Sequence, residues 1–332
     1  MIEEYYLKTG VCYDDVRQSE KIFLIYTYKC NASCAHCLTE SDPLKSEKLS
    51  PELCRDILDA GLEYDKNWLM ISGGEALLYP REIEEVLKYA HGLGYYCCVG
   101  TNAFWAKTNA IAEEKLARLQ NHGLDAIFPS ATAYHSAYVP TERVLYLRDA
   151  ATKLGLVCEV NFYPSPNKKE DARILSLLSL ENDWYTDGLI TTGRDVSELS
   201  SAFQARQPRS LDDCGSLHLA FTPRGDAICN CNVTYRCDEF RETPFHLGNF
   251  LDEPLQTIFA RERDNRILQF MMSEPRNLVH AVLAEDEEVR DGYLANEANL
   301  EFFSATAYYL CVLKNPAYLQ ALDRAAQRSG IA

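Results

Sequence analysis

The early and middle parts of the chain alternate between apolar, β-rich segments and segments with helical periodicity. Strands are expected at Lys21–Tyr28, Asn67–Ser72, Tyr95–Gly100, Leu124–Ser130 and Leu156–Tyr163, with a weaker one at Asp187–Thr192. Helices between such strands predict right-handed βαβ units and a parallel sheet, because parallel neighbours need a long crossover. Six units of this kind predict an α/β fold, a partial (β/α)6 TIM-like barrel.

The intervening helices have recognisable starts and apolar faces. Ser50-Pro51 combines an N-cap serine with a proline at the first helical position. After Pro80, apolar residues recur at helical spacing at Ile83, Val86, Leu87 and Ala90. Further helices are expected at about 109–121, around Leu147, Ala151 and Leu154, and near 170–180.

The alternating pattern ends near residue 195. His218–Thr222 and Ala227–Ile228 flank a turn-forming segment, residues 223–226, and predict a β-hairpin. From Pro254 onward the pattern is helical. We therefore expect two domains, the partial barrel at 1–195 and a C-terminal extension at 196–332 that ends in helices.

Composition limits the class of protein. The chain has 332 residues and a net charge of −16, which disfavours nucleic acid as a partner. No segment approaches the roughly 20 apolar residues that span a membrane, and the N-terminus does not resemble a signal peptide. We expect a cytoplasmic protein, in which the 13 cysteines are core residues, metal ligands or reactive thiols.

Three cysteines follow the first predicted strand within one short loop: Cys30, Cys34 and Cys37. Cysteine thiolates are ligands for iron–sulfur clusters and for zinc. A cubane cluster has four irons, so three ligands would leave one iron open to an exogenous ligand. The alternatives are a structural zinc site with a distant fourth ligand and three core cysteines. The polar residues Asn31, Ser33 and His36 argue against a buried strand.

Polar motifs follow the second and third predicted strands as well. In Ser72-Gly73-Gly74-Glu75, the glycines allow close approach of the backbone to a ligand, and the carboxylate can accept from an ammonium group. Thr101-Asn102 can bond ribose hydroxyls or a carboxylate. The alternatives are an ordinary turn for the first motif and a loop N-cap for the second.

The CxxxCxxC motif followed by GGE resembles the radical S-adenosylmethionine superfamily over roughly residues 20–195. The resemblance implies that the amino and carboxylate groups of S-adenosylmethionine chelate the open iron. It implies reductive cleavage of this cofactor to a 5′-deoxyadenosyl radical, which abstracts hydrogen from a substrate. His36 stands where the family usually has an aromatic residue.

The same resemblance assigns roles to individual residues. Cofactor contacts are expected at His36, Ser72, Gly73, Gly74, Glu75, Thr101, Asn102, Ser130 and Asn161. Tyr134 and His135 follow the fourth strand and are candidate catalytic residues on the substrate side of the pocket. Some peptide- and natural-product-modifying members of the family have a similar Tyr/Phe-His pair followed by a proline, which is Pro140 here. The alternative for His135 is a surface loop histidine.

A second group of cysteines surrounds the predicted hairpin. The spacing Cys214-x10-Gly225-x3-Cys229, with Leu247-Gly248-Asn249 beyond it, resembles SPASM and twitch extensions, although the family usually has four residues before this cysteine. The resemblance implies one auxiliary [4Fe–4S] cluster, with ligands from Cys214, Cys229, Cys231, Cys237 and Cys311. Zinc binding and simple packing are the alternatives. The remaining cysteines, at positions 12, 54, 97, 98 and 158, are expected to be structural.

The expected function is that of a radical S-adenosylmethionine enzyme acting on a peptide or natural-product intermediate. Its electron donor would be a flavodoxin or a ferredoxin. The second hypothesis is a non-catalytic iron–sulfur or zinc protein in electron transfer or scaffolding. That hypothesis explains the cysteines but not Gly73-Gly74-Glu75.

Overall fold

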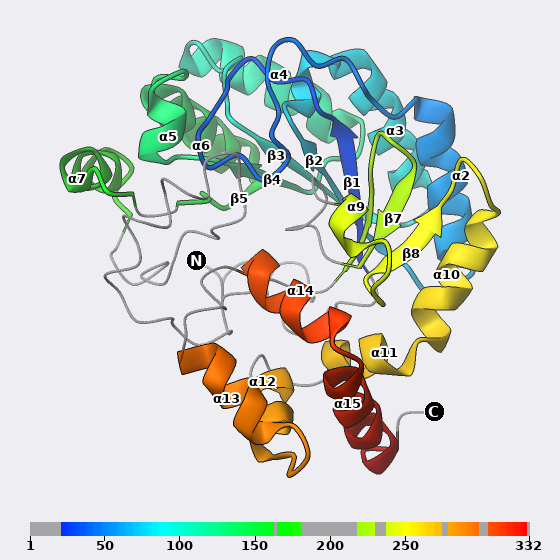
Figure 1. Ribbon diagram of the computed structural model, residues 1–332. Coiled ribbons are helices and arrows are strands. Elements are labelled where there is room, and N and C mark those ends of the chain that lie inside the picture. The colour runs from blue at the N-terminus through cyan, green and yellow to red at the C-terminus, as the bar shows by residue number, and fades with distance from the viewer. Residues whose placement is uncertain are drawn as a thin grey trace. The chain divides into compact units, whose positions relative to one another are not determined.

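The computed structural model describes residues 21–162, 165–180, 218–229, 237–273, 278–298 and 305–330 (Figure 1). These residues divide into two compact units. The first contains the described residues 21–34 and 41–180, and the second contains 35–40 and the described residues from 218 onward. The expected domain boundary at residue 195 and the expected strand Asp187–Thr192 lie outside the described residues.

The first unit is built on an open parallel sheet with the strand order β5-β4-β3-β2-β1. The strands are β1 (Lys21–Thr27), β2 (Trp68–Gly73), β3 (Tyr96–Thr101), β4 (Ala126–Pro129) and β5 (Val157–Cys158). Each neighbouring pair among them runs parallel. The predicted α/β fold with a parallel-rich sheet is confirmed, and its described strands form an open sheet rather than a closed barrel.

Helices connect these strands, as the alternation in the sequence predicts. They are α2 (Pro51–Leu62), the 3-10 turn η2 (Ala76–Leu78), α3 (Pro80–Gly92), α4 (Asn109–Asn121), α5 (Ala133–Ser136), α6 (Glu142–Leu154) and α7 (Lys168–Leu177). Helix α3 packs against β3 and α6 against β5, while α2 packs on α3 and α4 on α6. The predicted apolar face of α3 is buried along its length.

Local signals in the sequence explain where these helices begin and end. The Ser50 side chain accepts a hydrogen bond from Leu53 N at the start of α2, and Thr108 does the same for Ile111 N at the start of α4. Helix α6 ends at Gly155, whose φ of 63° is readily adopted only by a residue without a side chain.

Strand β5 is shorter than the predicted segment Leu156–Tyr163. Its regular part is two residues long, but the chain beyond it stays bonded to β4. Glu159 N donates to Ile127 O, Asn161 N donates to Pro129 O, and Ser130 and Asn161 form an isolated parallel bridge. Among the described residues beyond it, Pro166 lacks the N–H that further pairing would need.

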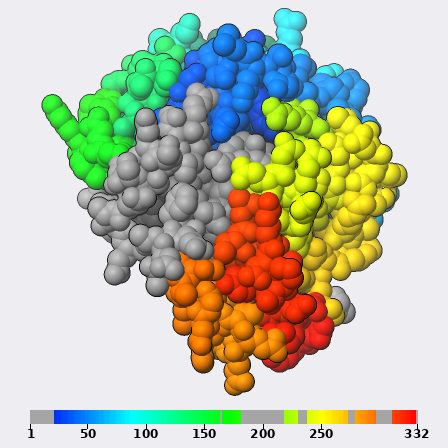
Figure 2. Space-filling model, viewed as in Figure 1, coloured from blue at the N-terminus to red at the C-terminus, as the bar shows by residue number. Residues whose placement is uncertain are grey.

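The second unit contains an antiparallel ribbon of β6 (Leu219–Phe221), β7 (Asp226–Ile228) and β8 (His246–Asn249), which confirms the predicted hairpin. The Phe221 ring lies 5.6 Å from the rings of both Phe250 and Phe259 and forms the core beneath the ribbon. Helix α10 (Leu255–Asp264) packs against β8, and both segments belong to the yellow part of the surface in Figure 2.

The remaining described elements of this unit are helical, as predicted for those after Pro254, whereas α9 was not predicted. They are α9 (Cys237–Phe240), α11 (Arg266–Ser273), α12 (Leu278–Glu285), α13 (Arg290–Ala298), α14 (Ala305–Lys314) and α15 (Pro316–Arg328). Across the described residues, no helix combines the length and the apolar character that a membrane crossing requires.

The core of the first unit gives a test of the fold. Leu24 in β1 is fully buried, whereas Leu44 is 95% exposed. Leu24→Ala should lower the free energy of unfolding by about 2–5 kcal/mol, because it leaves a cavity among packed side chains. Leu44→Ala makes the same chemical change and should stay within about 0.5 kcal/mol of the wild type. Urea unfolding measures both, and equal effects would contradict the assignment of β1 to the core.

Candidate functional site

The predicted site residues gather at the carboxyl edge of the parallel sheet. Thr27 ends β1, Gly73 ends β2 and Thr101 ends β3, while Ser130 follows β4. Ligands of open α/β sheets bind outside this edge, because the loops that leave it converge there. The motifs predicted after the first four strands therefore lie at the edge where such a fold places a site.

The glycines after β2 allow its end to approach the backbone that leads into the first cysteine loop, residues 30–37. Gly74 N donates to Thr27 O at 2.7 Å, and Glu75 N donates to Lys29 O at 2.9 Å. A Cβ on Gly74 would lie 2.2 Å from Lys29 O, and one on Gly73, whose φ is 121°, would lie 2.5 Å from Thr27 O. The close contact between the ends of β1 and β2 therefore requires both glycines, independently of any bound ligand.

Glu75 is fully buried and its carboxylate links β2 to the loop after β3. Oε1 accepts from Thr101 Oγ1 at 2.9 Å and from Leu77 N at 3.2 Å, while Oε2 accepts from Asn102 N at 2.7 Å. Burial raises the pKa of Glu75 to about 7 against the opposing effect of these hydrogen bonds. The predicted contact of this carboxylate with an ammonium group stays a prediction.

Thr101 and Asn102 also shape the loop that they begin. Thr101 Oγ1 accepts from Ala103 N at 3.1 Å and from Trp105 Nε1 at 3.2 Å. Asn102 Oδ1 accepts from Phe104 N at 3.0 Å. Both side chains therefore accept from backbone N–H groups at the start of this loop, as the alternative to cofactor binding, a loop N-cap, also would. Nothing in the sequence indicates the role of Trp105.

The side-chain amide of Asn102 reaches the first cysteine loop. Its Nδ2 donates to Asn31 Oδ1 at 2.9 Å and lies 3.7 Å from Cys30 Sγ. Asn102 is 6% exposed, so these contacts are made away from water. The motifs after β1, β2 and β3 thus form one connected hydrogen-bond network, which we call the strand-end network: Cys30, Asn31, Glu75, Thr101 and Asn102.

The cysteine loop itself is irregular. Cys30 and Cys34 are buried, and Cys30 N donates to Asp42 O at 3.0 Å. Tyr138, an exposed residue after α5, donates from its hydroxyl to Ser33 O at 2.9 Å and so fixes the backbone between these two cysteines.

The last cysteine of the loop belongs to the second unit. Cys37 is partly exposed, and its Sγ lies 3.5 Å from Thr39 Oγ1. His36, beside it, is also partly exposed. Within the described ranges, no group of three or more His, Cys, Asp or Glu side chains is arranged to hold a single metal ion.

Ser130 and Asn161 join β4 and the segment after β5 to the same edge. Ser130 N donates to Thr101 O at 2.8 Å, and Ala131 N donates to Asn161 O at 2.9 Å. Both predicted residues are partly exposed, unlike the buried Glu75 and Thr101. Their side chains can therefore meet a ligand, and that contact stays a prediction.

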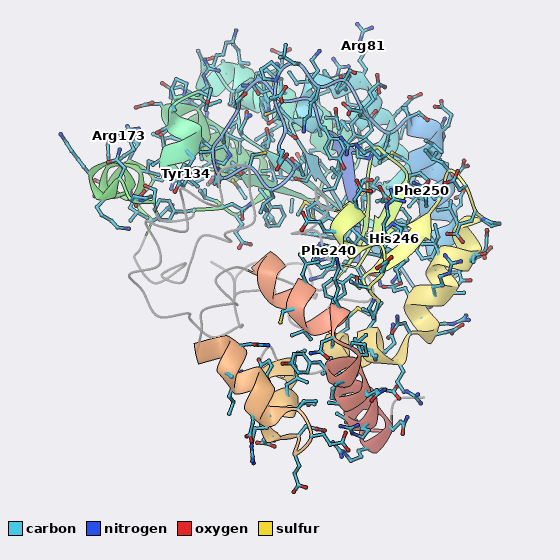
Figure 3. All side chains as sticks on the ribbon, viewed as in Figure 1. Arg81, Tyr134, Arg173, Phe240, His246 and Phe250 are labelled. Atoms are coloured by element: carbon cyan, nitrogen blue, oxygen red, sulfur yellow. The ribbon has the colours of Figure 1, made fainter. Side chains whose placement is uncertain are left out.

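Tyr134 and His135 lie on α5, the helix that follows β4. Figure 3 labels Tyr134. Thr132 caps this helix and contacts His135 Nδ1 at 2.9 Å. Burial lowers the pKa of His135 to about 4 and raises that of Tyr134 to about 12, so both side chains are neutral at pH 7. Threonine is one of the favoured N-cap residues, so Thr132 could have been found from the sequence.

The predicted ligands of the auxiliary cluster are described only in part. Cys214 and Cys231 lie outside the described residues, and Cys237 begins α9. Cys229 is fully buried at the end of β7, where its N–H donates to Phe245 O. Cys311 lies in α14 with its Sγ 3.8 Å from Asn296 Nδ2.

The motif residues of the hairpin have structural contacts of their own. Asn249 Nδ2 donates to Arg224 O, and a Cβ on Gly225, whose φ is 88°, would lie 2.3 Å from Asn249 Oδ1. A Cβ on Gly248, with a φ of 131°, would lie 1.9 Å from Glu253 Oε1. Figure 3 shows His246 and Phe250 on the same ribbon. The hairpin geometry alone therefore requires both glycines.

The other cysteines with described surroundings behave as predicted. Cys54 in α2 and Cys97 and Cys98 in β3 are fully buried. Cys158 lies in β5, and burial raises the pKa of its thiol to about 12. Cys12 lies outside the described residues.

Gly74 provides a test of the contact between the strand ends. Gly74→Ala should lower the melting temperature and weaken the packing around Glu75, because its Cβ would clash with Lys29 O. A Cβ on Gly92, the last residue of α3, would meet nothing within 4 Å, so Gly92→Ala should be neutral or slightly stabilising. Thermal unfolding followed by circular dichroism compares the two, and equal melting temperatures would contradict the close approach.

Comparison with known proteins shows which family the first part of the chain resembles. Residues 24–153 match the family model described as the Radical SAM superfamily. A "Putative peptide biosynthesis protein YydG" of Bacillus subtilis is 22% identical over 129 residues, which is 38% of this chain and 40% of that protein. The "Mycofactocin maturase MftC" of Mycobacterium tuberculosis is 36% identical over 64 residues, 19% of this chain and 16% of the relative.

Solved structures are similar at lower levels of identity. BtrN in complex with AdoMet and 2-DOIA has a TM-score of 0.48 at 12% identity, covering 82% of this chain and 92% of that one. The anSMEcpe structure with bound AdoMet and Cp18Cys peptide also has a TM-score of 0.48, at 10% identity, covering 93% and 99%.

The chain spans less than half the length of these two sequence relatives. The matched segment begins in β1 and ends in α6, so it contains the cysteine loop, the strand-end network and α5. The match supports an enzyme rather than a structural protein. The chain is therefore similar to the radical S-adenosylmethionine superfamily over residues 24–153.

Proposed function

We propose that this protein is a radical S-adenosylmethionine enzyme that acts on a peptide or natural-product intermediate. The observation that carries the proposal is the strand-end network. It joins Cys30 to Glu75 and Asn102, residues of three motifs that are far apart in the sequence. A radical S-adenosylmethionine enzyme needs these three motifs at one edge of its sheet.

The residues of the first cysteine loop suit a [4Fe–4S] cluster. Cys30, Cys34 and Cys37 would be its ligands, and the first two are buried thiols in a loop fixed by backbone hydrogen bonds. An amide N–H faces the sulfur of Cys30, as is common around cluster thiolates. When bound, the cluster and S-adenosylmethionine supply the electron and the 5′-deoxyadenosyl radical that removes hydrogen from the substrate.

The residues at the sheet edge would hold S-adenosylmethionine. Partly exposed groups, the side chains of Ser130 and Asn161 and the backbone around Ser72, Gly73 and Gly74, would contact it directly. The buried Glu75, Thr101 and Asn102 would position those groups through the strand-end network. Their predicted direct contacts with S-adenosylmethionine, including that of Glu75 with its amino group, remain part of the proposal. His36 would lie beside the cofactor through its place in the cysteine loop.

Tyr134 and His135 would face the substrate. The depressed pKa of His135 keeps its imidazole neutral at pH 7, so it can form a hydrogen bond with the substrate. A peptide substrate is supported by the name of one relative, a putative peptide biosynthesis protein, and by the maturase name of another.

The C-terminal part would form a twitch-like extension with one auxiliary [4Fe–4S] cluster. Cys214, Cys229, Cys231, Cys237 and Cys311 remain its proposed ligands. A flavodoxin or a ferredoxin would donate electrons in the cytoplasm, where the cysteines stay reduced. The proposed function involves no nucleic-acid partner and no membrane.

The non-catalytic alternative accounts for less of the site. An electron-transfer or scaffold protein needs cluster or zinc ligands, but it does not need Gly73-Gly74-Glu75 packed against the strand that leads into them. The match of residues 24–153 to the superfamily model also favours the enzyme.

Cofactor cleavage tests the proposal. Anaerobically reconstituted protein with dithionite and S-adenosylmethionine should release 5′-deoxyadenosine, measured by liquid chromatography. Cys34→Ala should abolish this release, because one of three cluster ligands is lost. Cys97→Ala makes the same change at a buried cysteine of β3 and should retain it.

Two results would overturn the proposal. One is a colourless protein, or one with iron that never yields 5′-deoxyadenosine. The other is undiminished release by Cys34→Ala, which would remove the cluster from this loop.

Iron analysis tests the auxiliary cluster separately. Cys214→Ala combined with Cys237→Ala should lower the iron content by about four atoms per chain, because two ligands of one [4Fe–4S] cluster are lost. The first cluster should remain and still support 5′-deoxyadenosine release at a measurable rate. An iron content equal to that of the wild type would mean that these cysteines bind no cluster.

A further inference from the structure

The side-chain amide of Asn102 lies against the sulfur of the first cysteine in the loop. Its Nδ2 lies 3.7 Å from Cys30 Sγ, within the range of an N–H···S hydrogen bond, and 2.9 Å from Asn31 Oδ1. A primary amide nitrogen carries two hydrogens, so one can point to each partner. The two contacts therefore do not compete for the same proton.

The orientation of this amide is fixed by a third contact. Asn102 Oδ1 accepts from Phe104 N at 3.0 Å. If the amide were turned over, its NH₂ group would face the Phe104 N–H, so that two donors would meet and this hydrogen bond would be lost. The contact with Phe104 N therefore assigns the amide oxygen to Phe104 and the NH₂ group to Cys30 Sγ and Asn31 Oδ1.

The backbone of Asn102 is fixed as well. Its N–H donates to Glu75 Oε2 at 2.7 Å, and the residue is 6% exposed. The backbone N–H and both polar atoms of the side chain are thus satisfied inside the protein. The local dielectric constant inside the protein is lower than in water, so a hydrogen bond there has a stronger electrostatic effect on its acceptor.

We propose that Asn102 is a positioning residue for the cluster, donating an N–H···S hydrogen bond to the Cys30 thiolate and raising the reduction potential of the cluster. This inference rests on the proposed function, because it requires a cluster on Cys30. Reduction by one electron adds negative charge to the cluster and its sulfurs. A donor aimed at one sulfur stabilises that charge, which makes reduction easier.

This role differs from the cofactor contact expected for Asn102 from the sequence. A residue that binds S-adenosylmethionine directly changes the affinity for it but has no reason to change the potential of the cluster in its absence. A donor to Cys30 changes that potential without any S-adenosylmethionine present. The two roles therefore separate in a measurement on cofactor-free protein.

The experiment is a redox titration of the full chain, reconstituted anaerobically and followed by electron paramagnetic resonance without S-adenosylmethionine. Asn102→Ala removes the donor. Asn102→Asp keeps the shape and the acceptor for Phe104 N but puts a charged oxygen near the sulfur. Both should shift the midpoint potential to more negative values, Asp further than Ala. A tenfold lower ratio of reduced to oxidised cluster corresponds to about 59 mV for one electron.

Asn31→Ala is the matched control, because it removes the other partner of the same amide and leaves the donor to Cys30. Its midpoint potential should equal that of the wild type. Circular dichroism confirms that each variant is folded, and iron content confirms that each holds its cluster. If Asn102→Ala fails to fold, the near-isosteric Asn102→Asp decides the question.

The outcomes separate the two proposals. A wild-type protein that binds no cluster contradicts the proposed function and removes the basis of this inference. If the wild type holds a cluster and its midpoint potential equals those of Asn102→Ala and Asn102→Asp, the result contradicts this inference but leaves the proposed function intact. An equal shift in Asn31→Ala would also contradict it, because the effect would then come from displacement of the loop rather than from the N–H···S bond.

Discussion

The candidate site depends on one buried carboxylate. Glu75 is fully enclosed, and its two oxygens accept three hydrogen bonds, one from Leu77 after β2 and two from Thr101 and Asn102 at the end of β3. A buried carboxylate without such donors would cost several kcal/mol, so the loops that supply them are held in place around it. Asn102 takes part in the same network and contacts Cys30. The position of the first cysteine relative to the sheet therefore follows from the burial of Glu75.

The two glycines before Glu75 make this arrangement sterically possible. They bring the end of β2 against Thr27 and Lys29, the residues that lead into the cysteine loop. The GGE motif thus has a structural explanation within the chain itself: two residues without side chains at a contact between strand ends, followed by an acid that holds the next loop. Cofactor binding would use a surface that these contacts have already positioned.

Much of the fold could be predicted from the sequence, because hydrophobic periodicity and capping residues are local signals. The strands β1 to β4 and the helices that begin at Pro51 and Pro80 lie where the pattern places them. The short β5 could not be predicted, since its end depends on pairing with β4. For the site, the sequence identifies Glu75 and Asn102 but assigns both to the ligand. Their contacts with other strand ends are long-range and leave no local pattern.

The central claim is that Cys30, Cys34 and Cys37 hold a cluster with one iron open to S-adenosylmethionine. The most direct test is the electron paramagnetic resonance spectrum of the reduced, reconstituted protein before and after S-adenosylmethionine is added. We predict a signal of a reduced [4Fe–4S] cluster whose g-values shift on addition, because the cofactor becomes a ligand of the open iron. A signal that the cofactor leaves unchanged, or no cluster signal at all, would contradict the account.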